Sequence, residues 1–402
     1  MKTKIDFINN GTITSVQGFK AGAVSAGIKK KGHKPDLGIV YSEKPCTAAG
    51  VFTRNLVKAA PLAICQNRLP AGDMHIIVAN SGYSNAVTGE QGMQDAIEMT
   101  VLAAKKMGVK PDSALVASTG VIGINLPMDA IRKGIDDIKL SDDGGHDFAR
   151  AIMTTDTVSK EAAVCVNDGQ FTIGGVAKGS GMIHPNMGTL LCFLATDAVV
   201  DKEFLADSLR KAADVSLNMV SVDNDTSTND TMIIMANGLA NNKKIDKKSE
   251  MAEAFQEALN AVCIFLAKAV AADGEGAGKL IEVNVCGAKD IESARICART
   301  IATSSLVKTA IHGCDPNWGR IIAAAGRSGA EVVETKMDLS ICGIELLEKG
   351  VALPFRKEQV SKAMADKTVT IDLNLNLGKA AATAWGCDLT AEYVSINADY
   401  TT

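Results

Sequence analysis

Aromatic residues and metal-binding patterns are both scarce in this chain of 402 residues. Aromatics make up 4% of the sequence and hydrophobic residues 47%, which favours a core of small aliphatic side chains of the kind common in α/β packing. The ten cysteines are spread singly without a C-x-x-C pair, and the five histidines show no H-x-x-x-H spacing. Because neither pattern offers a disulfide framework or a metal cluster, we expect reduced thiols and no metal site.

An excess of positive charge and long apolar runs are also missing. The formal net charge is −4, which excludes the broad basic surface that a nucleic acid or an anionic membrane would attract. No stretch approaches the ~20 apolar residues that span a bilayer, and the first residues do not lead into an apolar run of signal-peptide length. We therefore expect a cytoplasmic protein that has no nucleic-acid or membrane partner.

The local patterns indicate alternating strands and helices. Strands are predicted at 12–16, 22–28, 37–42, 50–53, 75–79, 115–117, 231–236, 280–286 and 368–377. Helices are predicted after Thr88, which would form a capping box with Gln91, and at 128–138, 145–153, 201–217, 248–271, 290–302 and 318–327. Asn167-Asp-Gly169 should join 161–167 to 170–177 as a hairpin. Together these elements favour a layered α/β or α+β chain with mixed sheets.

A glycine-rich stretch from Lys178 to Leu191 lies near the middle of the chain, between strands expected at 171–177 and 190–195. Its three glycines and one proline require tight or left-handed turns. Thr189 then follows Gly188 at the start of a buried strand. That is an unusual place for a polar side chain, which makes Thr189 the candidate for a chemical role.

Thr189 can act on the chain itself. Its hydroxyl, pressed against the carbonyl of Gly188, can attack that carbonyl and move the acyl group from nitrogen to oxygen, and Gly188 leaves the carbonyl accessible. Hydrolysis of the ester would free a chain that begins at Thr189, whose α-amine, with a pKa of about 8, lies next to its own hydroxyl. On these residues alone an alternative stays open, in which Thr189 caps the strand and Lys178 is a solvated surface lysine.

Further segments rich in Gly, Thr, Asn and Asp accompany this stretch. They are Asn80–Gly92, Ser118–Gly123, Thr154–Thr157, Ser221–Asp223, Asp225–Asp230, Asp273–Ala277, Leu306–Ala310, Asp315–Ile321, Ala384–Leu389 and Ile396–Tyr400. In this order they resemble the motifs of the ornithine acetyltransferase family, also called the bifunctional glutamate N-acetyltransferases. The resemblance covers essentially the whole chain. Gly188, where Ala is usual, and Tyr83-Ser84, where Asn-Ala is usual, depart from the pattern, and Tyr83 is placed to narrow a nearby pocket.

The resemblance implies a fold and a processing event. The fold is an α-β-β-α sandwich similar to that of N-terminal-nucleophile hydrolases but with its own connectivity. Cleavage would leave an alpha fragment, residues 1–188, and a beta fragment, residues 189–402, that stay folded as one body. The family also implies a heterotetramer of two alpha and two beta fragments.

Candidate groups around the nucleophile come partly from the residues and partly from the resemblance. Thr119 and Gly120 lie where a strand ends, so that backbone N–H groups there are free to face an oxyanion, although an ordinary turn has the same pattern. Lys178 can pair with a carboxylate, and Glu275, flanked by glycines, can pair with an ammonium or be a solvated loop charge. The resemblance implies an oxyanion hole at Thr119 and Gly120. It also implies substrate contacts at Thr155, Lys178, Thr189, Glu275, Asn397 and Thr402.

The function expected from the resemblance is a two-step acetyl exchange. Thr189 would take the acetyl group from N-acetylornithine, and glutamate would accept it to give N-acetylglutamate in the cyclic arginine pathway. No cofactor is expected for this exchange, and acetyl-CoA is the candidate second acetyl donor in a bifunctional member. Two alternatives stay open, namely a self-cleaving aminopeptidase or amidohydrolase in which water resolves the acyl-enzyme, and a binding protein that never cleaves.

Overall fold

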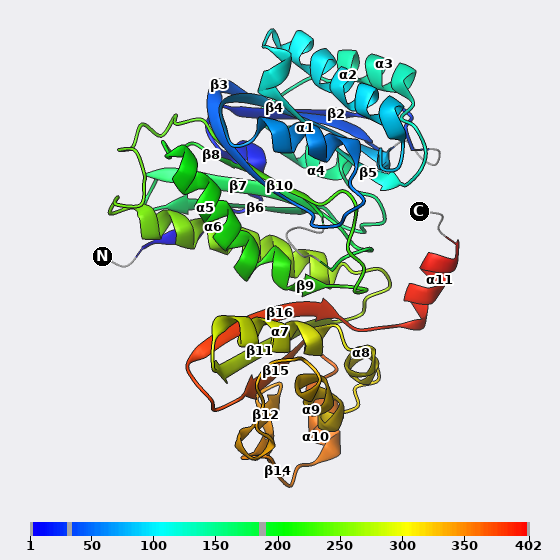
Figure 1. Ribbon diagram of the computed structural model, residues 1–402, viewed down its shortest axis with the longest axis vertical. Coiled ribbons are helices and arrows are strands. Elements are labelled where there is room, and N and C mark those ends of the chain that lie inside the picture. The colour runs from blue at the N-terminus through cyan, green and yellow to red at the C-terminus, as the bar shows by residue number, and fades with distance from the viewer. Residues whose placement is uncertain (1–2, 30–33, 185–189, 400–402) are drawn as a thin grey trace.

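The computed structural model describes residues 3–29, 34–184 and 190–399, and they form a larger and a smaller body, each built on one sheet (Figure 1). The larger sheet has nine strands. Its order is β1 (Ile5–Phe7), β6 (Lys160–Val166), β7 (Phe171–Lys178), β8 (Leu191–Thr196), β10 (Thr231–Ala236), β3 (Leu37–Phe52), β4 (Ala71–Tyr83) and β5 (Ala114–Val121), with β2 (Phe19–Val24) also paired to β3.

The strand β3 bends the larger sheet. Its first half pairs with β2 and its second half with β10, while β4 runs along its other edge with register shifts between Tyr41 and Ala48. The strands predicted separately at 37–42 and 50–53 are therefore one strand of 16 residues. The prediction was wrong because Pro45 interrupts the local pattern, whereas a β-bulge accommodates such a residue within a strand.

Helices cover both outer faces of the bent sheet and one helix lies inside it. The elements of this body are α1 (Ala60–Arg68), α2 (Gly89–Met107), α3 (Met128–Asp137), α4 (Gly145–Ala151), α5 (Lys202–Val215) and α6 (Ala252–Ala272). The helices α1 and α2 pack on β5, whereas α5 packs on β3 and α6 on β6 and β7. The short helix α4 lies between the two halves, where Phe148 meets Phe193 of β8. This layering confirms the predicted α-β-β-α sandwich.

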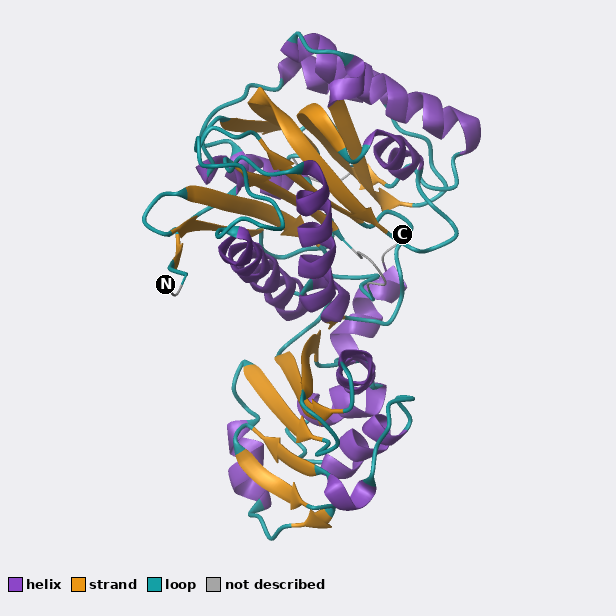
Figure 2. Ribbon diagram, turned by 60° about the vertical axis from the view of Figure 1, so that its left-hand side comes forward, coloured by secondary structure: helices purple, strands orange, loops and turns teal. Residues whose placement is uncertain are grey.

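The smaller body is a seven-stranded sheet with helices packed against it (Figure 2). Its strand order is β14 (Val351–Ala352), β13 (Ile344–Glu348), β12 (Asp338–Ile341), β15 (Thr368–Asn374), β11 (Leu280–Ala288), β16 (Ala380–Cys387) and β9 (Val220–Ser221). The accompanying helices are α7 (Ile291–Ala302), α8 (Ser305–His312), α9 (Trp318–Gly326) and α10 (Lys357–Ala363), and a last helix, α11 (Ala391–Asp399), returns toward the larger body (Figure 1).

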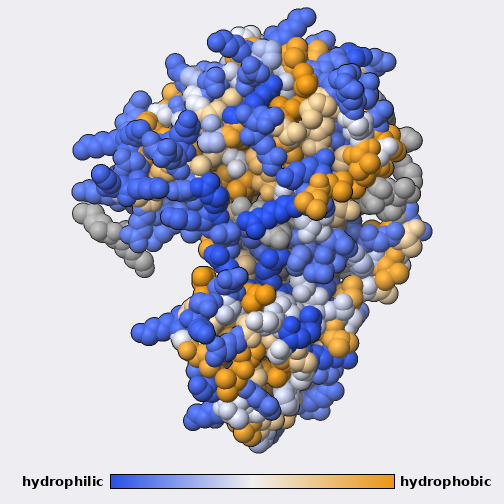
Figure 3. Space-filling view, viewed as in Figure 1, coloured by the Kyte–Doolittle hydropathy of each residue, from blue (hydrophilic) through white to orange (hydrophobic). Residues whose placement is uncertain are grey.

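The helix α6 joins the two bodies and corrects one expectation from the sequence. Over its 21 residues it is long and apolar enough to cross a membrane by length and composition, although no such stretch was expected. It packs on β6 and β7 of the larger sheet and on β9, β11 and β16 of the smaller one. Its apolar side chains belong to one core that runs through both bodies, and the surface over α5 and α6 is largely hydrophilic on the face shown in Figure 3. We therefore interpret α6 as a core helix.

Two local predictions near the N-terminal half were also wrong. The segment expected as a strand at 12–16 contains a 3-10 helix, Ile13–Ser15, because the Ser15 hydroxyl accepts a hydrogen bond from the N–H of Thr12 at 3.0 Å and stabilises a turn. Thr88 makes no cap hydrogen bond and instead donates to Asn85 Oδ1 at 2.7 Å. The hairpin between β6 and β7 is confirmed.

Strands from both sides of the predicted cleavage point interleave in the larger sheet. The strands β8 and β10, which follow residue 189, lie between β7 and β3, which precede it. Every residue of β8 and of β10 is buried. Separation of residues 1–188 from 189–402 would therefore break two strand ladders and expose apolar faces.

A chain cleaved between Gly188 and Thr189 is expected to remain one complex in native buffer. Native mass spectrometry should give the summed mass of both fragments, and denaturing solvent should release them separately. A Thr189→Ala chain, which lacks the nucleophile, serves as the uncleaved control. Fragments that separate in native buffer would contradict the sheet order.

Candidate functional site

Six of the predicted site residues line one cavity of about 150 Å³. They are Thr119, Gly120, Thr155, Lys178, Glu275 and Asn397. The wall of the cavity also includes Leu190 and Leu191, the residues that directly follow Thr189 in the chain. Gly188, Thr189 and Thr402 lie outside the described residues, so their predicted roles stay predictions.

The end of β5 supplies the first wall of the cavity. In the parallel pairing of β4 with β5, Gly120 lies opposite Gly82, and it has a φ of +129°. A Cβ at Gly120 would lie 2.3 Å from the carbonyl carbon of Gly82, so a side chain cannot fit there. The backbone of Thr119 and Gly120 is thus held at the cavity by two glycines that let the strands approach.

Lys178 lies at the opposite wall, where β7 ends. Its side chain is buried, and its Nζ lies 3.4 Å from the hydroxyl of Thr119. Burial lowers the pKa of Lys178, while the nearby carboxylate of Asp156 opposes that shift. The strand turns away directly afterwards at Gly179, whose φ is +153°. The alternative in which Lys178 is a solvated surface residue is therefore wrong.

Glu275 and Asn397 close the cavity from two segments far apart in the chain. Asn397 Nδ2, on α11, donates to Glu275 Oε2 at 2.9 Å, and the Glu275 N–H donates to the carbonyl of Ser180 at 2.9 Å. A Cβ at Gly181 would lie 2.5 Å from the Glu275 carboxylate. The Glu275 carboxylate therefore occupies space that a side chain at residue 181 would fill.

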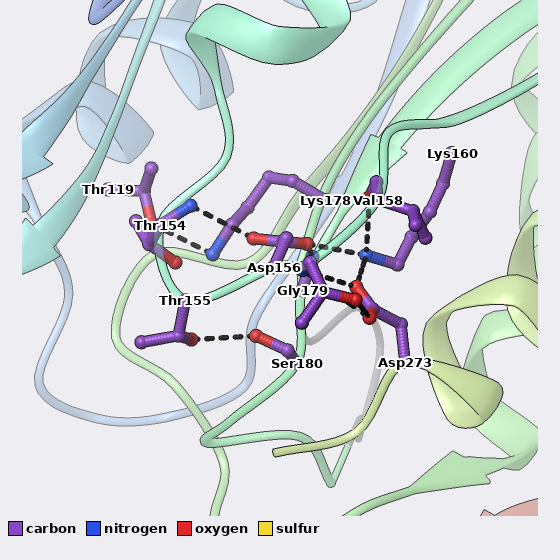
Figure 4. Close-up of polar contacts among 11 residues, drawn as sticks. Thr119, Thr154, Thr155, Asp156, Val158, Lys160, Lys178, Gly179, Ser180 and Asp273 are labelled. Atoms are coloured by element: carbon purple, nitrogen blue, oxygen red, sulfur yellow. Dashed lines mark hydrogen bonds and ion pairs between the residues drawn. The ribbon is translucent and has the colours of Figure 1, made fainter. Parts of the chain in front are cut away.

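Thr155 reaches the cavity from the loop that follows α4. Its hydroxyl lies 2.6 Å from that of Ser180 (Figure 4). The next residue, Asp156, forms ion pairs with Lys160, which in turn pairs with Asp273. Asp156 and Asp273 lie within the motif segments Thr154–Thr157 and Asp273–Ala277, but nothing in the sequence indicates a role for either residue.

The segment that precedes β10 supplies acidic and amide groups that the sequence did not identify. Asp223 accepts hydrogen bonds from the N–H groups of Met182 and Ile183 at 2.6 and 2.8 Å. Asn229 Nδ2 donates to the carbonyls of Ser84 and Ser118. Both residues lie in motifs quoted for the resemblance, and that membership was the only signal for them in the sequence.

Asp230, which lines the same cavity, is unusual because its carboxyl group is almost completely buried. The residue is 1% exposed, and no hydrogen bond of normal geometry reaches either carboxylate oxygen from residues 3–29, 34–184 and 190–399. Burial raises its pKa well above the ordinary value for a carboxyl group, although the nearby hydroxyl groups of Ser227 and Thr53 and the charge of Lys178 act in the opposite direction. The Thr231 N–H next to it donates to the carbonyl of Leu190 at 2.8 Å.

The cavity therefore offers one buried ammonium group, several carboxyl groups and a strand end held at close approach by glycines. A ligand with one carboxylate and one or more ammonium groups would find a partner for each charge, as an amino acid does. No group of three His, Cys, Asp or Glu side chains among the described residues is arranged to hold a metal ion.

Comparisons with known proteins indicate one family. A family model described as the ArgJ family matches residues 20–402. The arginine biosynthesis bifunctional protein ArgJ of Dehalococcoides mccartyi (strain CBDB1) is 54% identical over 405 residues and 100% of both chains. That of Symbiobacterium thermophilum is 49% identical over 98% of this chain and 99% of its own. A crystal structure of the argJ protein from Bacillus halodurans matches with a TM-score of 0.50 and 43% identity, over 51% of this chain and 96% of the solved one.

Asp230→Asn is expected to stabilise the protein increasingly as pH rises. The carboxyl group of Asp230 has a pKa near 3.9 in the unfolded protein and a higher pKa in the folded protein. Between these two values the folded protein holds a proton that the unfolded protein has lost. Stability is therefore lost as pH rises above the unfolded value, and the neutral amide removes that loss. We expect a gain of about 1–3 kcal/mol at pH 8 and little at pH 4.

Thermal unfolding of both proteins at the two pH values checks this expectation. Asp129→Asn removes a fully exposed carboxylate that pairs with Arg132; as the control it should change stability little at pH 8, because surface ion pairs contribute little. A variant less stable than the wild type at both pH values would contradict the assignment of Asp230 as a buried acid whose charged form is disfavoured.

Proposed function

Because the chain belongs to the ArgJ family of arginine-biosynthesis enzymes, we propose that it transfers the acetyl group of N-acetylornithine to glutamate through an acetyl ester on Thr189. The observation that carries this proposal is the cavity itself. It gathers Thr119, Lys178 and Glu275 around Leu190, the residue directly after the proposed nucleophile. An amino-acid substrate meets a cation, an anion and a strand-end backbone there.

The enzyme first prepares its own nucleophile. The Thr189 hydroxyl attacks the carbonyl carbon of Gly188, the peptide nitrogen leaves as the amine of Thr189, and water hydrolyses the ester to give a carboxylate at Gly188. The products are the alpha fragment, 1–188, and the beta fragment, 189–402. The solved relative supports this step. The match spans 96% of the solved chain but only 51% of this one, as expected if the solved chain is a shorter, processed fragment.

Acetyl transfer then proceeds in two steps with one nucleophile. The Thr189 oxygen attacks the acetyl carbon of N-acetylornithine while the Thr189 amine takes the hydroxyl proton and passes it to the departing amine of ornithine. The amine of glutamate then attacks the acetyl ester and releases N-acetylglutamate and the free hydroxyl. The backbone at Thr119 and Gly120 stabilises the negative oxygen that forms in each step.

Substrate binding uses the charges at the two ends of the cavity. Lys178 pairs with the substrate carboxylate and Glu275 with an ammonium group, since both are buried at the cavity and such bonds strengthen away from water. Thr155, Asn397 and Thr402 supply hydrogen bonds. The side-chain amide of Asn397 already orients Glu275.

Hydrolysis of the acyl-enzyme by water, as in a self-cleaving aminopeptidase or amidohydrolase, is the second candidate. The presence of Lys178 and Glu275 in one cavity favours an amino-acid acceptor instead. The ratio of N-acetylglutamate to acetate formed from N-acetylornithine and glutamate separates the two. Excess acetate at saturating glutamate would overturn the exchange.

We also propose where the enzyme is located, how its fragments assemble and which second acetyl donor it uses. We infer a cytoplasmic heterotetramer of two alpha and two beta fragments that needs no cofactor. Acetyl-CoA is the candidate second donor, and N-acetylglutamate formation from acetyl-CoA and glutamate in the absence of N-acetylornithine tests it.

Intact-mass analysis under denaturing conditions is expected to show two fragments that meet at Gly188 and Thr189. Thr189→Ala should remain one chain and lose exchange by roughly 10⁴-fold or more, because it loses both the nucleophile and the new amine. Thr189→Ser should retain cleavage and part of the exchange, since it keeps a hydroxyl. A Thr189→Ala protein with full exchange would refute the mechanism.

Gly181→Ala is expected to fold but to bind its amino-acid substrates poorly. The added methyl group would displace the Glu275 carboxylate, which is the end of a flexible side chain. Loss of a charged hydrogen bond of about 1.5–3 kcal/mol should raise KM roughly 10- to 100-fold.

Steady-state kinetics measures this effect against Gly72→Ala. At Gly72 a Cβ would meet nothing within 4 Å, so this control should behave as the wild type. An unchanged KM in Gly181→Ala would argue that Glu275 does not bind substrate.

A further inference from the structure

Lys160 is not among the described residues that line the cavity, and yet it is completely buried close to it. It is the first residue of β6, and its side chain is 0% exposed. Its Nζ lies 2.6 Å from Asp156 Oδ1 and 2.6 Å from Asp273 Oδ2, and it also donates to the carbonyl of Val158 at 3.3 Å (Figure 4). All of its neighbours in this network are buried groups or backbone near the site.

The first carboxylate, Asp156, ties two segments of the cavity wall together. Its Oδ1 accepts the N–H of Gly179 at 2.6 Å, and its Oδ2 accepts the N–H of Thr154 at 2.9 Å. Thr155 lies next to it in the chain, and Lys178 directly precedes Gly179. The position of Asp156 therefore sets the positions of two proposed substrate contacts.

The second carboxylate, Asp273, connects this network to Glu275, the third proposed substrate contact. It accepts hydrogen bonds from the N–H and the hydroxyl of Thr157, the former at 3.0 Å, and it lies two residues before Glu275. Since Asp273 follows residue 189 whereas Lys160 precedes it, this ion pair joins the two proposed fragments directly beside the cavity.

Stability alone gives a weak reason to bury this cluster. Removal of charged groups from water costs several kcal/mol per ion, and apolar side chains of similar size often serve a core at least as well. What a fully hydrogen-bonded buried network provides is a fixed geometry. The cluster lies where three separate segments must be held in register for one ligand.

The charges also affect how Lys178 is used. Burial would raise the pKa of Asp156, but the ammonium groups of Lys178 and Lys160 outweigh it and hold that pKa below the ordinary value. The Asp156 carboxylate is thus shared by two cations, Lys160 and Lys178. If Lys160 lost its charge, Asp156 would attract Lys178 alone and draw it away from Thr119 and the cavity.

We propose that Lys160 is a positioning residue for substrate binding, which acts through Asp156 and Asp273 to hold Thr155, Lys178 and Glu275 at the cavity and to leave Lys178 available to the substrate carboxylate. This inference rests on the proposed acetyl exchange. Lys160 itself touches no substrate.

Lys160→Met, which keeps the length of the side chain and removes its charge, tests the inference in the full chain. We expect cleavage to occur, kcat to stay within about threefold, and KM for glutamate and N-acetylornithine to rise at least about tenfold, because misplacement of binding groups costs this much or more. The matched control is Lys268→Met. Lys268 lies on α6, which ends directly before Asp273, and it forms an ion pair with Glu282 at 2.6 Å outside the cavity lining.

The pH profile gives a readout that a merely structural role would not move. Exchange should fall as pH rises through the pKa of Lys178, and loss of the Lys160 charge raises that pKa, so the alkaline limb of kcat/KM should shift to higher pH. The charged groups that face Lys178 are Asp156 from the loop after α4, Lys160 from β6, Asp230 before β10, Glu275 after α6 and Lys29 after β2.

Asp273→Asn provides the second variant if Lys160→Met does not fold. It retains a side-chain oxygen for Thr157 but weakens the pair with Lys160, and it should raise both KM values in the same direction. Wild-type KM values and an unshifted alkaline limb in a folded variant would overturn the positioning role while the exchange itself stands. A wild-type protein without exchange would overturn the proposed function, and this inference with it.

Discussion

The pairing of β7 with β8 is the constraint on which the site depends. Their antiparallel register places Lys178, the last residue of β7, opposite Leu191, the first residue of β8. On its other edge β8 pairs in parallel with β10, and all of its residues are buried. Because β8 is paired along both edges and packed on both faces, a slip by one residue would misalign two ladders and disrupt the packing of both faces, so this register is strongly fixed. The segment after the proposed nucleophile is therefore held against the only lysine that lines the described cavity.

The same sheet order brings the buried charged residues together. Lys178, Asp156 and Lys160 come from adjoining parts of β6, β7 and the loop before them, while Asp273 enters from the end of α6. Such a cluster is tolerated because each charge faces an opposite one or a backbone group. Asp230 also lies at the cavity, and there burial disfavours its charged form despite the nearby charge of Lys178.

Local sequence signals predicted those elements whose pattern is self-contained. The hairpin at Asn167–Gly169 follows from residues with positive φ at all three positions, and α5 begins where Asp201 caps it. The predictions failed where a distant element decides. The joined strand β3 depends on partners at both edges, and α11, missed in the sequence, has no buried residue and is held through contacts such as that of Asn397 with Glu275.

The sequence by itself determined the family, the layered α/β class and the residue types that could carry acyl transfer, because these reside in short motifs and periodic patterns. It did not determine which of those residues meet. Thr119 lies 59 residues from Lys178, Lys160 lies 113 from Asp273, and Glu275 lies 122 from Asn397. Only the tertiary structure closes these separations, through the strand order of the larger sheet and through the packing of α6 and α11 beside it. That order is selected by burial of apolar faces across the whole chain, an interaction that no local segment contains.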